Sequence, residues 1–515
     1  MRSHNANNLF MRSSKKVSQP SQTAPKIQVV SQERKSASWT IKNPHAAGID
    51  LGSRRHFVAV PPDSVAENES FVRDFGPFTD ELQKMVEWLK ACGVKTVAME
   101  STGVDWVPVY RHLDRAGLEV ILVNTKQRKH APQRKTDVMD CQWIQQLHSY
   151  GLLSGSFVPE ELIQRFRILT RHRERMIDRA KQDTQPIQKA LTEMNVPLHH
   201  VISDVMGETG QRILKAILAG ERDPDRLLEL RDEQISLSTK AQMRSALIGD
   251  YRGEQVWVIG QAYESFLFAH QQIEATDVAL EKLLGSMAVE ARKRREAMVP
   301  ADKSKAAPVE NSEKPSGEPP KAPGKKKPCQ TRKRNDPKVK LEPLLSEVFG
   351  IDLTQVLGFR VLGLLVLLAE VGFDLSRFPN AKAFASWLGL CPNNKISGGK
   401  VLSRRTKHVV NRLSIFLRMS AVALGRTETT LGWFYRRQRA QLGPSGAATA
   451  TARKLACLVY HLIKKQEVYV EPDLLKHKIQ YNQRRRSKLI KQIEQLGYEV
   501  IVKPKKETET LQTCE

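Results

Sequence analysis

Alternating apolar and polar positions predict an α/β region between residues 44 and 155. Four short apolar runs, "AAGIDL", "HFVAVP", "VKTVAME" and "LEVILVN", have the length and composition of strands. Between them, "TDELQKMVEWLKACG" has the spacing of an amphipathic helix. Because strand-like and helix-like segments alternate, we expect an α/β sheet domain in this region.

Apolar positions spaced alternately four and three residues apart predict long helices between residues 156 and 290. Arg173 and Asp183 interrupt this apolar seam, and Pro186 is expected to kink its helix. Two interpretations fit the pattern: a coiled-coil arm that pairs copies of the chain, or a helix packed within its own domain. The seam consists of Leu162, Phe166, Leu169, Met176, Ala180, Ile187, Ala190 and Met194.

Composition divides the rest of the chain. Residues 1–43 are polar and basic and are predicted to be a disordered extension. Residues 291–340 are rich in Lys and Pro and are predicted to be a disordered linker. Residues 341–470 predict a second, mostly helical unit, and residues 471–515 a basic tail. In the second unit, "VLGFRVLGLLVLLAEVG" is either a degenerate helix-hairpin-helix or a buried helix.

The net charge of the chain indicates what kind of partner it binds. The 515 residues carry a formal net charge of +26, which suggests a polyanion such as nucleic acid, although basic tails alone would also raise the charge. The longest apolar run, residues 361–373, is too short to span a bilayer, so no membrane association is expected. The six cysteines form no CxxC pair, which favours reduced thiols in the cytoplasm.

Four carboxylates stand at positions where chemistry is expected. Asp50 lies within an apolar strand, where a buried charge needs compensation, and Glu100 ends another strand. Asp137 and Asp140 are three residues apart and would share one face of a helix. Thr136 is the expected N-cap of that helix.

Carboxylates brought together from two strands and a helix start suit a magnesium or manganese site for phosphoryl transfer. The preceding basic loop would then hold the phosphates. For each residue alone, a cap, a turn or a solvated loop is the simpler explanation; for the whole set, we favour the metal site. The loop cations are Lys126, Arg128, Lys129, Arg134 and Lys135.

Two further motifs are candidates for contact with phosphate. "GIDLGS" also resembles the phosphate-binding start of actin-like ATPases and sugar kinases, but the chain has no second phosphate loop of the Asp-Gly-Gly type. Ser397 precedes two glycines, which permit close approach of a backbone to a ligand. Without a base nearby in sequence, Ser397 taken alone is better explained as a phosphate contact or turn residue. The cations around it are Lys395, Lys400, Arg404, Arg405 and Lys407.

Taken together, these stretches resemble the DEDD-type insertion-sequence transposases. The resemblance covers most of the chain from residue 44 onward. Its motifs are "GIDLGSRRHFVAVP", "VAMESTGVDWVPVY", "RKTDVMDCQWIQQLHSYGLL", "ILKAILAGERDP", "FASWLGLCPNNKISGGKVLSRRTK" and "ATARKLACLVYHLI".

The resemblance implies a RuvC-like, RNase H-like domain over residues 44–155, a coiled coil over 156–290 and a C-terminal transposase domain over 341–470. It assigns the acidic tetrad and a nucleophilic serine, and with them a Mg²⁺ or Mn²⁺ cofactor. The tetrad is Asp50, Glu100, Asp137 and Asp140, and the serine is Ser397.

The implied partners are donor and target DNA, and a guide (bridge) RNA encoded by the element itself. The implied assembly is a homo-oligomer, a dimer or tetramer, in the bacterial cytoplasm at the nucleoid. We expect a recombinase that uses the tetrad and the serine. Two alternatives stay open: a junction-type nuclease that uses only the metal site, and a non-catalytic nucleic-acid-binding protein.

Overall fold

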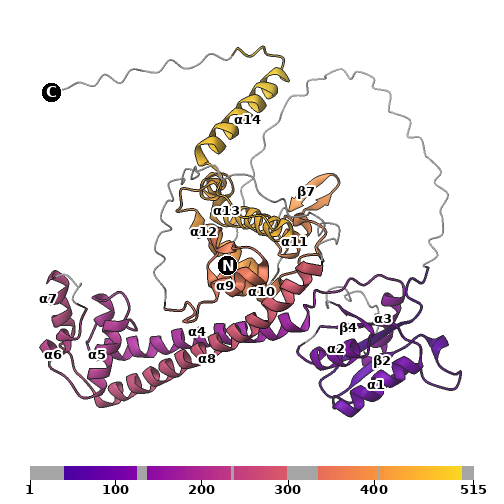
Figure 1. Ribbon diagram of the computed structural model, residues 1–515, viewed down its shortest axis with the longest axis horizontal. Helices are drawn as coiled ribbons and strands as arrows, with labels where there is room; N and C mark the ends of the chain where they lie inside the picture. The colour runs from indigo at the N-terminus through magenta and orange to yellow at the C-terminus, as the bar shows by residue number, and fades with distance from the viewer. Residues whose placement is uncertain are drawn as a thin grey trace, which may run out of the picture. The chain divides into compact units, whose positions relative to one another are not determined.

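The computed structural model describes residues 40–101, 103–123, 136–232, 237–297, 334–403, 405–407, 409 and 411–501. The chain divides into two compact units, Met1–Val158 and Pro159–Glu515, and each is described by itself (Figure 1). Most of the predicted extension 1–43 and linker 291–340 lies outside the described residues. No helix in the described part of the chain is long and apolar enough to cross a membrane.

The first unit is built on a five-stranded mixed sheet in the order β3-β2-β1-β4-β5 (Figure 1). β1, β2 and β3 are antiparallel neighbours, whereas β1, β4 and β5 run parallel. This mixed sheet confirms the predicted α/β class and is consistent with an RNase H-like fold. The strands are β1 (Ala46–Leu51), β2 (His56–Ala59), β3 (Val72–Phe75), β4 (Thr96–Glu100) and β5 (Glu119–Val123).

Helices cover both faces of this sheet, because its central strands are apolar on both sides. Ile49, Val97 and Met99 pack into one core beneath α1 and α2. On the opposite face, Ala98 packs with Ile144 of α3. The helices are α1 (Thr79–Ala91), α2 (Trp106–Arg115) and α3 (Asp137–Ser149), and a short 3₁₀ helix, η1, spans Pro62–Ser64.

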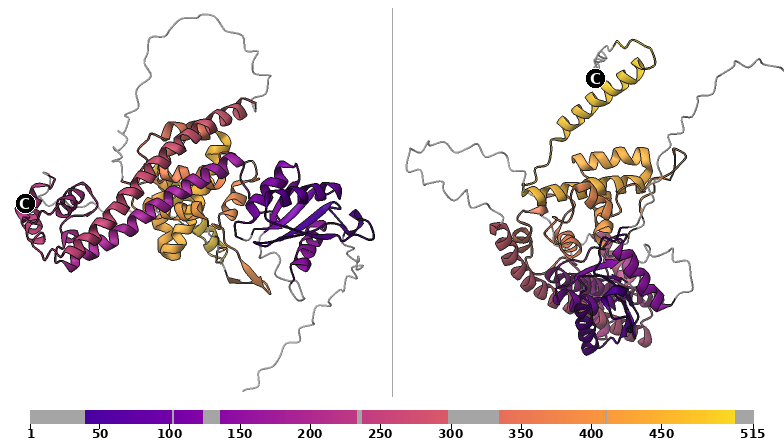
Figure 2. Two further views of the ribbon diagram at one scale, coloured as in Figure 1. Left: turned by 90° about the horizontal axis from the view of Figure 1, so that it is seen from below. Right: turned by 90° about the vertical axis from the view of Figure 1, so that its right-hand side faces the viewer.

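In the second unit, two long helices, α4 (Glu161–Glu193) and α8 (Gly253–Ala297), pack side by side (Figure 2). α4 continues through Pro186 without ending. The predicted seam is partly right: Phe166 is fully buried, but Leu162 is half-exposed and Ile163 takes the core position beside it. The seam of α4 therefore faces α8 of the same chain, as the within-domain interpretation predicts.

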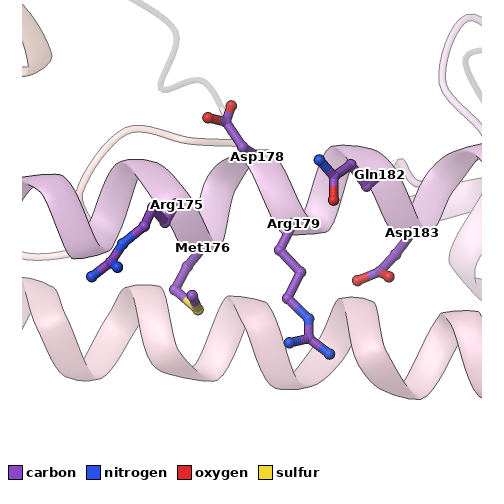
Figure 3. A pocket seen from close by; sticks show the side chains of 6 residues that line it. All are labelled: Arg175, Met176, Asp178, Arg179, Gln182 and Asp183. Carbon is purple, nitrogen blue, oxygen red and sulfur yellow. The ribbon is translucent and has the colours of Figure 1, made fainter.

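The two polar interruptions of the seam have partners on α8. Arg173 Nε donates to Asp277 Oδ1 at 2.5 Å, and both side chains are 2% exposed. Ser265 Oγ donates to Asp183 Oδ2 at 2.9 Å. Asp183 and Arg179 line a shallow pocket on α4, and both side chains point toward the neighbouring helix (Figure 3). Polar pairs thus complete the contact between the two helices.

A small helical cap joins the far ends of α4 and α8. Ile187 of α4, Ile213 of α5 and Ile259 of α8 share its core. The cap elements are η3 (Leu198–His200), α5 (Glu208–Leu218), α6 (Pro224–Glu229) and α7 (Leu237–Ala246).

Apart from the last helix, which has no buried residue, the C-terminal helices pack around α10, which is almost wholly buried. Of the two interpretations of this segment, the buried helix is the one that the structure shows. Its core also includes Phe166 and Leu284, so the long helices and the C-terminal helices belong to one compact unit. The helices are α9 (Glu342–Phe349), η5 (Leu353–Gln355), α10 (Val361–Val371), α11 (Ala381–Trp387), α12 (Arg412–Leu424), α13 (Thr430–Lys465) and α14 (Leu474–Glu494).

Candidate active site

Two carboxylates lie at the same level on the central strands of the first unit. Parallel pairing of β1 with β4 sets Ile49 opposite Met99, so the next residues, Asp50 and Glu100, are neighbours across the two strands. Side chains at one level of adjacent strands share a face of the sheet. Asp50 is half-buried, and Glu100, the last residue of β4, is buried. The two strands therefore deliver both carboxylates to one end of one face.

Helix α3 lies directly against β1 on this same face. A Cβ atom on Gly48 would be 2.3 Å from the backbone nitrogen of Gln145 and 2.4 Å from the carbonyl oxygen of Cys141, so this approach requires glycine. Gln145 Nε2 donates to the carbonyl oxygen of Ala46 at 3.3 Å. Since Gln145 lies beside Ala46 and Cys141 beside Gly48, α3 runs antiparallel to β1. Its first turn is thus directed toward the Asp50 end.

The start of α3 confirms the predicted cap. Thr136 Oγ1 accepts a 3.3 Å hydrogen bond from the backbone nitrogen of Met139. Asp137 and Asp140, the first and fourth residues of the helix, share one of its faces. Asp140 is buried, with 9% exposed, whereas Asp137 is exposed. Only the deeper aspartate is enclosed by the fold, because Asp137 lies at the helix end.

Two of these carboxylates act on the thiol of Cys141, a buried residue of α3. Burial raises the pKa of Cys141 to about 12, and the negative charges of Asp50 and, more weakly, Asp140 act in the same direction. Cys141 also directly follows Asp140 and lies against Gly48, two residues before Asp50 on the same face, so Asp50 and Asp140 are both close to it. With Glu100 beside Asp50, three of the four predicted carboxylates gather on the α3 face of the sheet.

This donor set fits a hard divalent cation, because carboxylate oxygens are the ligands that Mg²⁺ and Mn²⁺ prefer. Within the described ranges, no three His, Cys, Asp or Glu side chains form a group that could hold one metal ion. Convergence of all four carboxylates on one ion stays a prediction. The five loop cations, Lys126, Arg128, Lys129, Arg134 and Lys135, lie outside the described residues.

In the second unit, Ser397 lies at the tip of a β-hairpin formed by β6 (Lys395–Ser397) and β7 (Lys400–Ser403). Gly398 and Gly399 form its two-residue turn with φ values of 52° and 75°. A turn with φ > 0 at both central residues has the twist that matches a hairpin, and glycine adopts it without strain. The glycines thus hold Ser397 at the last position before a tight turn.

The two faces of this hairpin differ in chemistry. Ser397 is paired with Lys400, and directly opposed residues of an antiparallel pair share a face. Ile396 and Val401 are paired on the other face and are 62% and 42% exposed. Lys395, Lys400 and Lys407 are exposed, as is Arg405, whereas Arg404 lies outside the described residues. The serine therefore has a cation directly across from it.

Two features of the site were missed in the sequence. Gly48 is the contact that seats α3 on β1; a glycine inside an apolar strand is the signal that indicates such a close approach. The hairpin was predicted only as a glycine-rich loop; the Gly-Gly pair between "KIS" and "KVLS" is the signal for a two-residue turn.

Two models of known protein families match segments of the chain that include these candidate residues. A model of IS110-type DEDD transposases, described as a transposase, matches residues 47–196. A second model, described as the transposase IS116/IS110/IS902 family, matches residues 352–436. The first match spans all four carboxylates, and the second spans Ser397. No curated protein matches the chain. The two family matches lie in the expected order and contain four of the six sequence motifs, and the chain therefore belongs to the DEDD-type insertion-sequence transposases.

Proposed function

We propose that this transposase cuts and rejoins DNA strands with two chemical centres, the acidic tetrad and Ser397. The observation that carries the proposal is the strand register. It sets Asp50 and Glu100 side by side, on the face where α3 brings Asp140. A carboxylate cluster of this kind at the ends of parallel strands supports phosphoryl-transfer chemistry, because carboxylate oxygens are the ligands that a hard divalent cation prefers.

RNase H-like DEDD domains generally use divalent metal ions, and we propose Mg²⁺ or Mn²⁺ here. Asp50, Glu100, Asp137 and Asp140 would hold it. When bound there, a divalent cation supplies Lewis-acid stabilisation of the negative charge on phosphoryl oxygens. Asp137 is exposed at the start of α3, so it is the member of the tetrad that solvent and substrate reach most directly.

Ser397 would act as the nucleophile. Its Oγ forms a bond to a DNA phosphorus atom while the bond from that phosphorus to one bridging sugar oxygen breaks. The serine proton is lost to a base or to solvent, and the departing sugar oxygen gains a proton. The resulting phosphoserine diester conserves the phosphodiester bond energy, so a second DNA hydroxyl can displace the serine and rejoin the strands without an external energy source.

Lys400 would hold the phosphate that Ser397 attacks. It is paired directly across the hairpin from the serine, and its side chain is exposed to an incoming strand. A lysine ammonium acts as a point charge on phosphate oxygens. Lys395 lies on the same strand as Ser397, two residues before it, and Arg405 and Lys407 add positive charge at the base of the hairpin. Arg404 is assigned to the same role from the sequence.

The proposed function also includes an RNA guide and an assembly of several copies of the chain. We propose that donor and target DNA are selected by pairing with an RNA of the element, which would share the excess positive charge of the chain. We also propose that the chain acts as a homo-oligomer, because strand exchange needs two duplexes held together. The seam of α4 is used within the chain, so contact between copies would involve other surfaces of the helical pair.

The three carboxylates that gather on the α3 face are tested by changing each one to its amide in the full chain. Asp50→Asn, Glu100→Gln or Asp140→Asn should abolish strand cleavage, by at least about 10³-fold, while nucleic-acid binding persists. Glu87→Gln on α1, an exposed carboxylate of the same unit, is the matched control and should cleave normally. Cleavage by all three amide variants at the control rate would exclude the metal-site assignment.

The guide is tested by removing RNA from the purified protein with nuclease and then restoring it. Recombination should stop on removal and return when the co-purifying RNA is added back. Undiminished recombination after complete removal would reject the RNA guide while leaving DNA cleavage unaffected.

A further inference from the structure

The last helix, α14, is a strongly basic helix that lies outside both family-matched ranges. In 21 residues it has seven Lys and Arg side chains, and Glu494 is its single carboxylate. None of its residues is buried. The cations are Lys476, Lys478, Arg484, Arg485, Arg486, Lys488 and Lys491.

These cations have no acidic partners in the described part of the chain, where no ion pair involves any of them. Elsewhere in this unit exposed arginines do pair: Arg244 with Asp225 at 2.6 Å, and Arg294 with Glu160 at 2.8 Å. A solvated helix surface usually mixes both signs of charge. The one-sided charge of α14 indicates a polyanionic partner rather than a role in packing.

The N-terminal half of α14 is nevertheless held in place by α13. Trp433 of α13 makes edge contacts with His477 and Tyr481, at ring-centroid distances of 5.6 and 5.1 Å. Arg437 stacks over the Tyr481 ring at 4.1 Å. Asp473 caps the helix by accepting from the backbone nitrogen of Leu475 at 2.8 Å. The aromatic anchor therefore fixes the first two turns, and the arginines begin three residues after Tyr481.

We propose that α14 binds the phosphate backbone of duplex DNA outside the reacting strands. DNA is the committed partner because the chain belongs to a family of transposases, so this inference rests on the DNA-acting part of the proposed function and not on the serine chemistry. A 21-residue helix is about 31 Å long, and therefore spans about nine base pairs. Arg484, Arg485 and Arg486 are consecutive, so they point about 100° apart and reach phosphates on both sides of a groove.

The test measures binding of the full-length chain to a 30-base-pair duplex by fluorescence anisotropy over a range of salt concentrations. Arg484→Gln, Arg485→Gln and Arg486→Gln together should weaken binding at least about tenfold at low salt. The slope of log Kd against log salt should fall by about 2.7, which is 0.9 for each of three lost phosphate contacts. Lys84→Gln, Lys90→Gln and Lys95→Gln together remove the same charge from the first unit and should change the slope little.

A second variant tests the contribution of the fixed position of α14 separately from that of its charge. Tyr481→Ala keeps all seven cations but removes the ring that contacts Trp433 and Arg437. Binding should weaken by less than in the triple variant, with the salt slope retained, because a loosened helix still neutralises phosphates but must be ordered on binding. Tyr481→Phe keeps the ring and should bind like the wild type.

Several outcomes would overturn the proposal. One is an unchanged Kd and slope in the triple arginine variant. Another is a loss confined to structured RNA, or to vesicles of anionic lipid, with duplex binding intact. A third is a change of oligomeric state in that variant, since Leu475 and Ile479 leave an exposed apolar edge on α14 that a second copy could cover. Ser397→Ala should bind the duplex normally, so failure of the serine mechanism leaves this test unaffected.

Discussion

At the scale of single residues, both candidate centres are built from side chains that share a face of a sheet or hairpin. Asp50 and Glu100 share one because their strands are parallel and in register, and Ser397 and Lys400 share one because theirs are antiparallel neighbours at a tight turn. In both cases the strand pairing, and not the packing of side chains, sets the positions of the functional groups. The residue predictions therefore concern charge and protonation.

Lys400→Ala should slow formation of the serine–DNA bond about 10- to 100-fold, because the cation across from Ser397 no longer holds the phosphate. Overall DNA affinity should change little, since one exposed cation contributes a small part of the binding. Lys400→Arg should recover most of the rate, and Lys382→Ala, an exposed lysine on α11, should have none of the defect. Single-turnover measurement of adduct formation checks this; a normal rate for Lys400→Ala would contradict it.

His148 predicts a pH dependence of stability in the first unit. Its buried Nε2 lies 2.9 Å from Thr96 Oγ1, and burial lowers the pKa of His148 below its ordinary value of 6.5. Between pH 6.5 and the lowered pKa, His148 is therefore protonated in the unfolded chain but neutral in the folded chain. The free energy of unfolding should fall as pH drops below about 6.5 toward the lowered pKa. Burial lowers the pKa of His56 as well, so His56 acts with the same sign.

Denaturant unfolding of the full chain at pH 7 and pH 5.5 measures this loss for the first unit. His148→Gln cannot protonate and should show a smaller loss over the same interval. An equal loss in the variant and the wild type would assign the pH dependence to other groups.

At the scale of elements, the sequence predicted four strands of the first sheet and the long helices, because their apolar periodicity is strong. The short and largely exposed strands β3, β6 and β7 were not predicted. The sequence predicted the N-cap of α3 because Thr136 precedes the helix with two aspartates in the first turn. It placed the α4 seam one residue off at Leu162, since a spacing of four and three residues drifts relative to a straight helix. The partner of that seam could not be predicted, because Asp277 and Ser265 lie about a hundred residues away on α8.

Gly48→Ala should displace α3 from β1. The added Cβ would lie 2.3 Å from the backbone nitrogen of Gln145, and both segments are backbone that cannot rotate away. We expect a loss of about 1–3 kcal/mol in the free energy of unfolding, together with loss of cleavage as Asp140 moves from Asp50. Gly285→Ala on α8 has open space for its Cβ and should be neutral or slightly stabilising. Equal stability of the two variants, measured by denaturant unfolding, would refute the close contact.

Arg173 and Asp277 should behave as a unit. Arg173→Ala leaves the Asp277 carboxylate buried without its partner and should cost about 3–5 kcal/mol in the free energy of unfolding. Arg173→Met combined with Asp277→Leu replaces the pair by apolar side chains of similar volume and should recover most of that loss. The double-mutant cycle is completed by the single variants Arg173→Met and Asp277→Leu. Additive destabilisation in this cycle, measured by denaturant unfolding, would show that the two residues do not interact.

At the scale of the whole molecule, the chain places its two candidate centres in separate compact units. The carboxylates lie in the first unit and Ser397 in the second. The family and the general function could be predicted from motifs, because both centres are encoded in short local stretches. The packing of α4 against α10 could not: Arg171 of α4 donates to the buried Glu370 of α10 at 2.9 Å, across 199 residues that include the Lys/Pro-rich linker.

The proposed serine mechanism requires that Ser397 forms a covalent bond with DNA. The most direct measurement incubates the full chain, with its co-purifying nucleic acid, with a suicide DNA substrate that cannot be rejoined, and maps the adduct by mass spectrometry. A serine nucleophile should leave a phosphodiester-linked nucleotide on the peptide that contains Ser397, and no adduct should form with Ser397→Ala, which should still bind DNA. Strand cleavage by Ser397→Ala at the wild-type rate, with no adduct on the wild-type chain, would rule out the serine nucleophile and favour a nuclease that uses water.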